Sequence, residues 1–258
     1  MILSRRVALN GVQLDQIDNA IVIRKVDAGA PTLSVNAVSR MGSVGQRVTS
    51  EHWEMLEVMI TYAIDLGKRQ MARRKEIFDA VNAWAMGKGW LTVNWMTNRR
   101  MWVDKVIVPN GGDMWDWTGG YTIAFRAYSV PFWQEENPAS VAANLTSGSV
   151  VLGVGGNVQT VIDLTFKNTS GSTINTFSVS AGGNTISLSD IGLLNGETLQ
   201  IHHGTDGLLR IVIGSRSVYN KRAAGVADDL YVQPGNVTVS VTAGGSGRLI
   251  VTCCGRYV

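Results

Sequence analysis

The sequence predicts a mainly β protein built of two parts. All eight tryptophans and all nine methionines precede residue 134, whereas eighteen of the 29 glycines follow it. A single helical periodicity stands among many short apolar runs, which are separated by Gly, Asn or Ser. These observations favour an N-terminal β-sandwich or barrel that carries one α-helix, followed by an all-β sandwich.

Composition predicts the boundary between the two domains and indicates the class of protein. The alternating apolar pattern stops at Pro131 to Pro138, so we expect domains at 1–137 and 138–258. An apolar fraction of 45% with 17% charged residues is typical of a folded globular protein. The net charge of +3 divides into sixteen basic and fourteen acidic residues before Pro138, and seven and six after it. Neither part therefore resembles a DNA clamp.

Targeting signals are not evident in the sequence. No apolar run reaches about 18 residues, and none near the N-terminus is long enough for a signal peptide. We expect no membrane anchor and a protein that is made and used without secretion.

The first part begins with predicted strands. Short apolar runs predict strands at Val7–Leu9, Ala20–Val26 and Thr32–Val38. A longer strand is expected from Trp53 to Ile64, because Leu56, Val58, Ile60, Tyr62 and Ile64 recur with a period of two.

One helix is expected over residues 68–86. Phe78, Val81 and Ala85 recur at helical spacing, and Gly87 and Gly89 are typical of a helix C-terminus. Three further strands then complete this part; they are expected at Leu91–Trp95, Met101–Val108 and Tyr121–Tyr128.

The second part contains seven short apolar runs with turn residues between them. Such runs, at a spacing of roughly 8 to 12 residues, predict a sandwich or barrel. The strands are expected at Val158–Phe166, Ile174–Val179, Thr185–Leu188, Thr198–His202, Leu208–Ile213, Asn236–Val241 and Leu249–Thr252.

Candidate catalytic and metal-binding residues are few. His202 and His203 are neighbours on a predicted strand, so their side chains point to opposite faces and are poorly placed to share a metal. The carboxylate pairs Asp113/Asp116 and Asp228/Asp229 are interpreted as solvated loop residues. Cys253 and Cys254 are adjacent, and we expect both to be reduced. The sequence therefore predicts no catalytic, cofactor-binding or metal-binding residues.

Two patterns leave alternatives open. The basic cluster of Lys68, Arg69, Arg73, Arg74 and Lys75 is interpreted as a solvated helix face, or as a contact for a protein or passing nucleic acid. The tryptophans at 90, 95, 102, 115 and 117 are expected in the core or at subunit contacts; the alternative is base stacking with single-stranded nucleic acid.

The order of elements resembles that of a known family, the distal tail (Dit) proteins of siphophages. The similarity rests on the single basic helix ending in the sequence Ala83 to Gly89, on the closing strand at 123–127 that leads into Pro131-Phe132-Trp133, and on Val232 to Val239 before a last strand. It covers nearly the whole chain. The family usually has an acidic residue before the closing proline, where this chain has Val130.

The resemblance implies a structural protein of the virion. It implies a tail-tube-like N-terminal domain at 1–137 and an outward-facing, galectin-like sandwich at 138–258. Six copies would form a ring at the tail tip, assembled in the host cytoplasm. Its partners would be the tail tube protein, a tail hub, fibre or lysin protein, receptor-binding proteins and, in the lumen, the tape measure protein, with only transient DNA passage. No catalysis or cofactor is implied.

Within that ring, subunit contacts are expected at the loop 110–120 and the strand 53–64. The interface candidates are Trp53, Trp115 and Trp117, because ring closure needs two different patches on each subunit. Two other functions remain open. One is a carbohydrate-binding module that stacks sugars on Phe166, Phe177, Tyr219, Tyr231 or Tyr257, and the other is a hydrolase.

Overall fold

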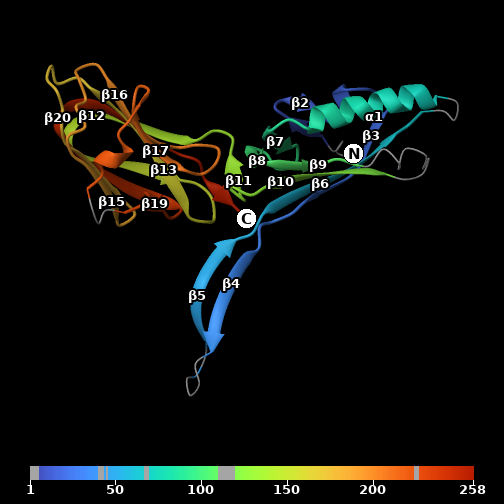
Figure 1. Ribbon diagram of the computed structural model, residues 1–258, viewed down its shortest axis with the longest axis horizontal. Coiled ribbons are helices and arrows are strands. Elements are labelled where there is room, and N and C mark those ends of the chain that lie inside the picture. The colour runs from blue at the N-terminus through green and yellow to red at the C-terminus, as the bar shows by residue number, and fades with distance from the viewer. Residues whose placement is uncertain (1–5, 40–43, 45, 67–69, 110–119, 224–226) are drawn as a thin grey trace. The chain divides into compact units, whose positions relative to one another are not determined.

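The computed structural model describes residues 6–39, 44, 46–66, 70–109, 120–223 and 227–258. The chain separates into two compact units, Met1–Trp133 and Gln134–Val258, so the division falls four residues before the expected boundary. The predicted fold class is confirmed: the protein is mainly β with one α-helix (Figure 1).

In the described residues of the first unit there are ten strands and the helix. Its elements are β1 (Val7–Leu9), β2 (Val12–Gln13), η1 (Leu14–Gln16), β3 (Ile21–Ala28), β4 (Leu33–Ser39), β5 (Gln46–Trp53), β6 (Leu56–Ile64), α1 (Met71–Ala85), β7 (Gly89–Val93), β8 (Arg99–Val103), β9 (Lys105–Ile107) and β10 (Tyr121–Ala127). Strand β11 (Trp133–Glu135) begins at the last residue of this unit.

Two groups of antiparallel strands form the body of the first unit. Strand β1 pairs with β2 and β7, and β7 pairs with β8. A separate four-stranded sheet has the order β3-β6-β10-β9. Alternate residues of β6 and β10 are buried, as the period of two predicted. Helix α1 packs on this sheet, because Phe78 contacts Tyr121 at 5.2 Å and Trp84 contacts Phe125 at 5.8 Å between ring centroids.

The predicted strand from Trp53 to Ile64 is wrong at its start. Trp53 ends β5, which pairs with β4 in a separate two-stranded hairpin, and β6 begins only at Leu56. The backbone N–H of Glu54 donates to the carbonyl of Thr32 at 2.8 Å, which closes the base of the hairpin. The chain therefore leaves the sheet after β3 and re-enters it at β6, and β4 and β5 project from the body of the unit (Figure 1).

The predicted strand Met101–Val108 is also divided. Asp104 separates β8 from β9, and its carboxylate accepts hydrogen bonds from the N–H groups of Tyr128 and Ser129 at 2.7 and 2.8 Å. The Asp104 side chain thus binds the backbone of the segment after β10, and at this residue the chain passes from the sheet of β8 to the sheet of β9.

The second unit is all β. Its elements are β12 (Ala139–Val154), β13 (Thr160–Asn168), β14 (Phe177–Ala181), β15 (Asn184–Leu188), β16 (Thr198–His203), β17 (Leu209–Ile213), β18 (Arg216–Ser217), η3 (Tyr219–Lys221), β19 (Tyr231–Val232), β20 (Gly235–Cys253) and β21 (Arg256–Tyr257).

A long strand, β20, joins the two layers of the second unit. Residues Ser240 to Ala243 pair with β14, whereas Gly247 to Cys253 pair with β13. Strand β12 accompanies β20 over most of its length, and the register shifts between Leu145 and Ser147. The sandwich is therefore one sheet curled on itself, because a strand with an irregularity can pass from one layer to the next.

Sequence patterns missed β12 and split β20 into two strands. Gly244, Gly245 and Gly247 suggested a turn, yet all three lie within β20. A Cβ atom on Gly247 would collide with the ring of buried Phe166 and with the carbonyl of Lys167. The glycine therefore permits close approach to the core rather than a reversal of the chain.

This close approach makes a testable prediction. Gly247→Ala should lower the free energy of unfolding by about 1–3 kcal/mol, because the added methyl group overpacks the Phe166 site. Gly153→Ala in β12 is the control, since its Cβ would meet only the Asn236 side chain at 3.9 Å. Urea unfolding followed by circular dichroism measures both. Equal stability of the two variants would contradict the packing argument.

Candidate functional site

The hairpin of β4 and β5 has one mainly apolar face, which also carries Glu51. The strand register places Leu33 opposite Trp53, Val35 opposite Glu51 and Ala37 opposite Val48 on the same side. Exposed fractions are 41% for Leu33, 48% for Val35 and 53% for Val48. The other side carries mostly polar residues, namely Ser34, Asn36, Val38, Arg47, Ser50 and His52. We call the first side the hairpin apolar face.

This face points to a contact with another molecule. An isolated two-stranded hairpin is marginally stable in water, and exposed apolar side chains gathered on one surface commonly mark interaction sites. Trp53 lies at the base of the hairpin, where its ring meets Phe132 edge-on at 5.4 Å. Of the three expected interface tryptophans, only Trp53 can be placed, because Trp115 and Trp117 lie outside the described residues.

The four-stranded sheet presents two different open edges. Within the described part of the chain, β3 pairs only with β6, and β9 pairs only with β10. The outer N–H and C=O groups of such strands are a ready template for pairing with another chain. The two edges have different sequences, so they can meet each other in a head-to-tail arrangement.

The outer face of the same sheet carries compensated charge. Arg126 bonds Glu57 at 2.5 Å and Lys25 bonds Asp27 at 2.6 Å. In the strand register the hydroxyls of Thr61 and Thr122, 3.3 Å apart across β6 and β10, lie level with Lys25. Exposed Met59 and Ile107 lie in the next row, so this surface mixes apolar groups with neighbouring charges of both signs.

The basic residues of α1 that the structure describes serve internal contacts. Arg74 is 4% exposed and donates to the carbonyl of Leu66 at 3.2 Å, so its interpretation as part of a solvated face was wrong. Arg73 binds Asp18 at 3.1 Å, and Lys75 binds Asp79 at 2.6 Å. Lys68 and Arg69 lie outside the described residues.

The tryptophans of β7 and β8 contact each other. The rings of Trp90 and Trp102 meet edge-on at 5.2 Å, and the guanidinium of Arg100 lies 3.9 Å from the centre of the Trp90 ring. Trp95 is 44% exposed. Because Arg100 already covers one face of Trp90, this pair is better suited to stiffening the sheet than to stacking bases.

In the second unit, His203 lies between two carboxylates. Its Nδ1 atom is 2.7 Å from Asp163 Oδ1, and its Nε2 atom is 2.8 Å from both carboxylate oxygens of Asp229. Asp229 is only 8% exposed and also accepts from the N–H of Leu230 at 2.7 Å. The interpretation of Asp229 as a solvated loop residue was therefore wrong, whereas Asp228 is exposed.

The two carboxylates set the charge of His203. Burial alone would lower the pKa of the imidazole, but the hydrogen bonds and charges of Asp163 and Asp229 raise it from 6.5 to about 9. The ring is therefore protonated at neutral pH and cannot act as a general base there. It joins β16, the start of β13 and the segment before β19 through charged hydrogen bonds.

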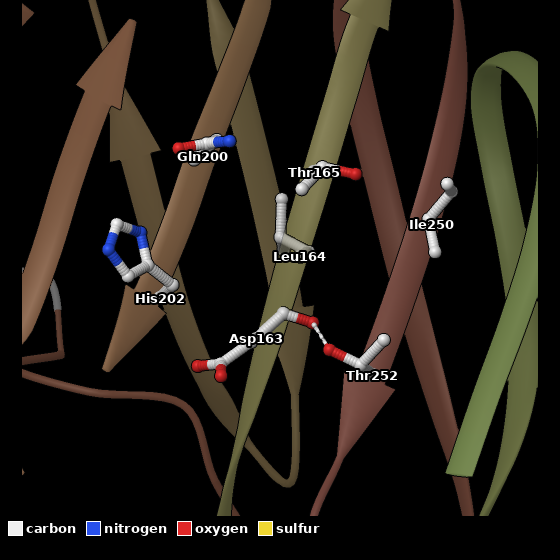
Figure 2. Close-up of a pocket in the computed structure, with 7 residues that line it drawn as sticks. All are labelled: Asp163, Leu164, Thr165, Gln200, His202, Ile250 and Thr252. Atoms are coloured by element: carbon white, nitrogen blue, oxygen red, sulfur yellow. Dashed lines mark hydrogen bonds between the residues drawn. The ribbon is translucent and has the colours of Figure 1, made fainter. Parts of the chain in front are cut away.

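His202 points to the other side of β16 and lines a pocket of about 280 Å³. The pocket lies over β13, β16 and β20, and Figure 2 shows its lining. It is formed by Asp163, Leu164, Thr165, Gln200, His202, Ile250 and Thr252. The two histidines thus serve different sites, as their alternation along the strand predicted. No cluster of three potential metal ligands occurs among the described residues.

Of the remaining expected residues, the two cysteines can be placed. Cys253 and Cys254 form no disulfide within the described part of the chain, and burial raises the pKa of Cys253 to about 12. Asp113 and Asp116 lie outside the described residues. No helix of the described chain is long and apolar enough to cross a membrane.

Comparisons with known proteins bear on the fold. No family model matches the chain, and no curated protein matches it. The solved structure of the phage SPP1 Dit (gp 19.1) protein, described as a paradigm of the hub adsorption apparatus in phages that infect Gram-positive bacteria, matches with a TM-score of 0.65. The sequences are 11% identical, and the match covers 96% of this chain and 98% of that one. A chain of the phage p2 baseplate matches with a TM-score of 0.45 at 8% identity, covering 96% and 97%.

The match to the SPP1 Dit structure confirms a Dit-like fold. The fold expected from the order of elements thus extends over nearly the whole chain, despite low sequence identity.

The charged contacts of His203 predict a dependence of stability on pH. Because the pKa is raised in the folded state, the stabilisation is fully present below about pH 6.5 and is lost as the pH rises through about 9. The shift corresponds to roughly 3 kcal/mol. The free-energy difference between the natural protein and His203→Gln should therefore shrink between pH 6 and pH 10.

Urea unfolding followed by circular dichroism is the suitable measurement, because all tryptophans precede the second unit and their fluorescence would not report on it. His52→Gln, on the exposed hairpin, is the matched control and should change stability little at any pH. A His203→Gln effect that is independent of pH would refute the charged state of the imidazole.

Proposed function

We propose that the protein is a structural component of a phage tail tip. Six copies form a ring that connects the tail tube to the baseplate hub and to tail fibre or lysin proteins. The observation that carries this proposal is the Dit-like fold over nearly the whole chain, together with two unlike open edges on the sheet of the first unit. The role is mechanical and requires no catalysis.

The open edges support ring closure. In the proposed ring, β3 of one copy lies beside β9 of the next, which continues the antiparallel sheet from subunit to subunit. Head-to-tail contacts of this kind close into a ring when the rotation between copies divides the circle. The edges would then lose their exposed backbone groups, and the risk of non-specific aggregation would fall.

The hairpin provides a second contact in this proposal. Its apolar face would pack on a neighbouring copy, with Leu33, Val35 and Val48 leaving water on assembly. Burial of these side chains removes apolar surface from water and so favours assembly. Trp53 stays an expected interface residue at the base of the hairpin, and the contribution of Trp115 and Trp117 stays a prediction.

The outer face of the four-stranded sheet suits the wall of a channel. Tape measure protein and then DNA would pass over Thr61, Thr122 and the compensated pairs Arg126–Glu57 and Lys25–Asp27. A wall of unopposed positive charge would retain DNA, whereas neighbouring opposite charges allow it to slide. The second unit would project outward and hold adsorption or receptor-binding proteins.

Four of the five aromatic residues named for sugar stacking are engaged in other contacts, whereas Tyr231 is 43% exposed. Phe166 and Phe177 are fully buried and pack on each other at 5.1 Å. Arg222 covers the ring of Tyr219 at 4.8 Å, and the Tyr257 hydroxyl donates to Glu135 at 2.8 Å. A hydrolase is disfavoured, because His203 is held protonated between its two carboxylates.

The hairpin contact predicts an assembly defect. Val35→Asp combined with Val48→Asp should abolish the ring, because two further carboxylates would be buried beside Glu51 in a mainly apolar contact. Ser34→Asp with Asn36→Asp adds the same charge to the opposite face of the same hairpin and should leave the ring intact. Sedimentation velocity distinguishes ring from subunit. If both double variants assembled equally well, the hairpin apolar face would not be a subunit contact.

The channel proposal predicts weak DNA binding. Affinity for a short DNA duplex should be low and should fall steeply as salt rises, since only scattered surface charges contact the phosphates. Fluorescence anisotropy of labelled duplex, titrated at low and physiological salt, measures this. Tight binding at physiological salt would argue for a DNA-holding role instead of passage.

A further inference from the structure

The pocket beside His202 presents polar groups from three neighbouring strands. Gln200 and His202 come from β16, Asp163 and Thr165 from β13, and Thr252 from β20 (Figure 2). The strand register explains the grouping, because Thr165 lies opposite Gln200 on one side and Ile250 on the other. The pocket is therefore a consequence of how three strands align.

Several of these groups have unused hydrogen-bonding capacity. No described residue hydrogen-bonds the side chains of Gln200, Thr165 or His202. Asp163 Oδ1 is occupied by the N–H and Nδ1 of His203 at 3.0 and 2.7 Å, but Oδ2 has no such partner. Amide, hydroxyl, imidazole and carboxylate groups thus converge without satisfying one another.

His203 fixes the carboxylate of this pocket. Its two bonds to Asp163 Oδ1 hold the carboxyl group in one orientation, and its positive charge offsets the charge of Asp163. Thr252 donates to the Asp163 backbone carbonyl at 3.5 Å, which links β20 to the same residue. A ligand therefore meets a positioned acceptor and does not need a positive charge of its own to bind it.

We propose that this pocket binds one ring of a saccharide through adjacent hydroxyl groups. Hydroxyls donate and accept, so they can satisfy a carboxylate oxygen, an amide, a threonine hydroxyl and an imidazole in one small space. A volume of about 280 Å³ admits a single ring-sized molecule. Ile250 supplies an apolar wall for the carbon-bound hydrogens of such a ring.

The chemistry favours a saccharide over a protein segment. Protein interfaces centre on aromatic and aliphatic anchors that are removed from water. The residues around this pocket include no phenylalanine, tyrosine or tryptophan. Without aromatic stacking, the affinity of one site rests on a few hydrogen bonds and lies in the millimolar range. Several copies in an assembly would raise the effective affinity for a polymeric glycan.

Saturation-transfer NMR on the full chain tests the proposal. The probes are methyl glycosides of glucose, galactose, mannose and N-acetylglucosamine, with cyclohexanol as a ring of similar size that bears one hydroxyl. At least one glycoside should bind and cyclohexanol should not. Gln200→Ala and His202→Ala should each weaken that binding roughly three- to tenfold, because each removes one or two hydrogen bonds.

Thr198→Ala, on β16 but outside the pocket, is the matched control and should leave binding unchanged. Asp163 is unsuitable for substitution, because its loss would also release His203. Circular dichroism of each variant verifies folding. Absence of glycoside binding, equal binding of cyclohexanol, or binding that is unaffected by Gln200→Ala would each overturn the proposal. Ring assembly is measured separately, so failure here leaves the proposed tail-tip function standing.

Discussion

Backbone hydrogen bonding at the edges of the four-stranded sheet is the constraint on which the account depends. Strands β3 and β9 each pair on one side only among the described residues, and the unpaired N–H and C=O groups of such an edge are a template for pairing with another chain. The hairpin of β4 and β5 adds a mainly apolar face on which Leu33, Val35 and Val48 are exposed. In the proposed function, contact with further copies of the same chain would cover both the open edges and this face. The charge pairs on the outer sheet face would then line a ring.

The second unit is organised by a different interaction. A protonated His203 joins two carboxylates from separate segments, so its charge is offset within the fold. This arrangement fixes Asp163 on the outer surface of β13, next to the unpaired polar groups of β16. Asp163 thus contributes to stability through its bond to His203 and also lines the candidate binding pocket. A structural ring and a glycan-binding surface are compatible, because they use different units.

Periodicity predicted those parts of the fold in which burial alternates regularly. Buried positions on β6, α1 and β10 follow from apolar spacing alone, because one face of each element must leave water. The break at Glu54 and Met55 was missed, since no Gly or Pro separates Trp53 from the apolar run that begins at Leu56. Strand β12 was missed although Val141, Ala143 and Leu145 alternate with small or polar residues, because the polar run 146–149 interrupts the apolar pattern. The burial of Asp229 could not be predicted from the sequence, since its partner His203 lies 26 positions away and only the fold brings the two residues together.

The most direct test of the central claim is native mass spectrometry of the purified chain, combined with negative-stain electron microscopy of the same sample. The account predicts a hexamer that appears as a closed ring with an open centre. A twofold dimer, or a chain that remains monomeric at high protein concentration, would contradict ring closure through the unlike edges β3 and β9.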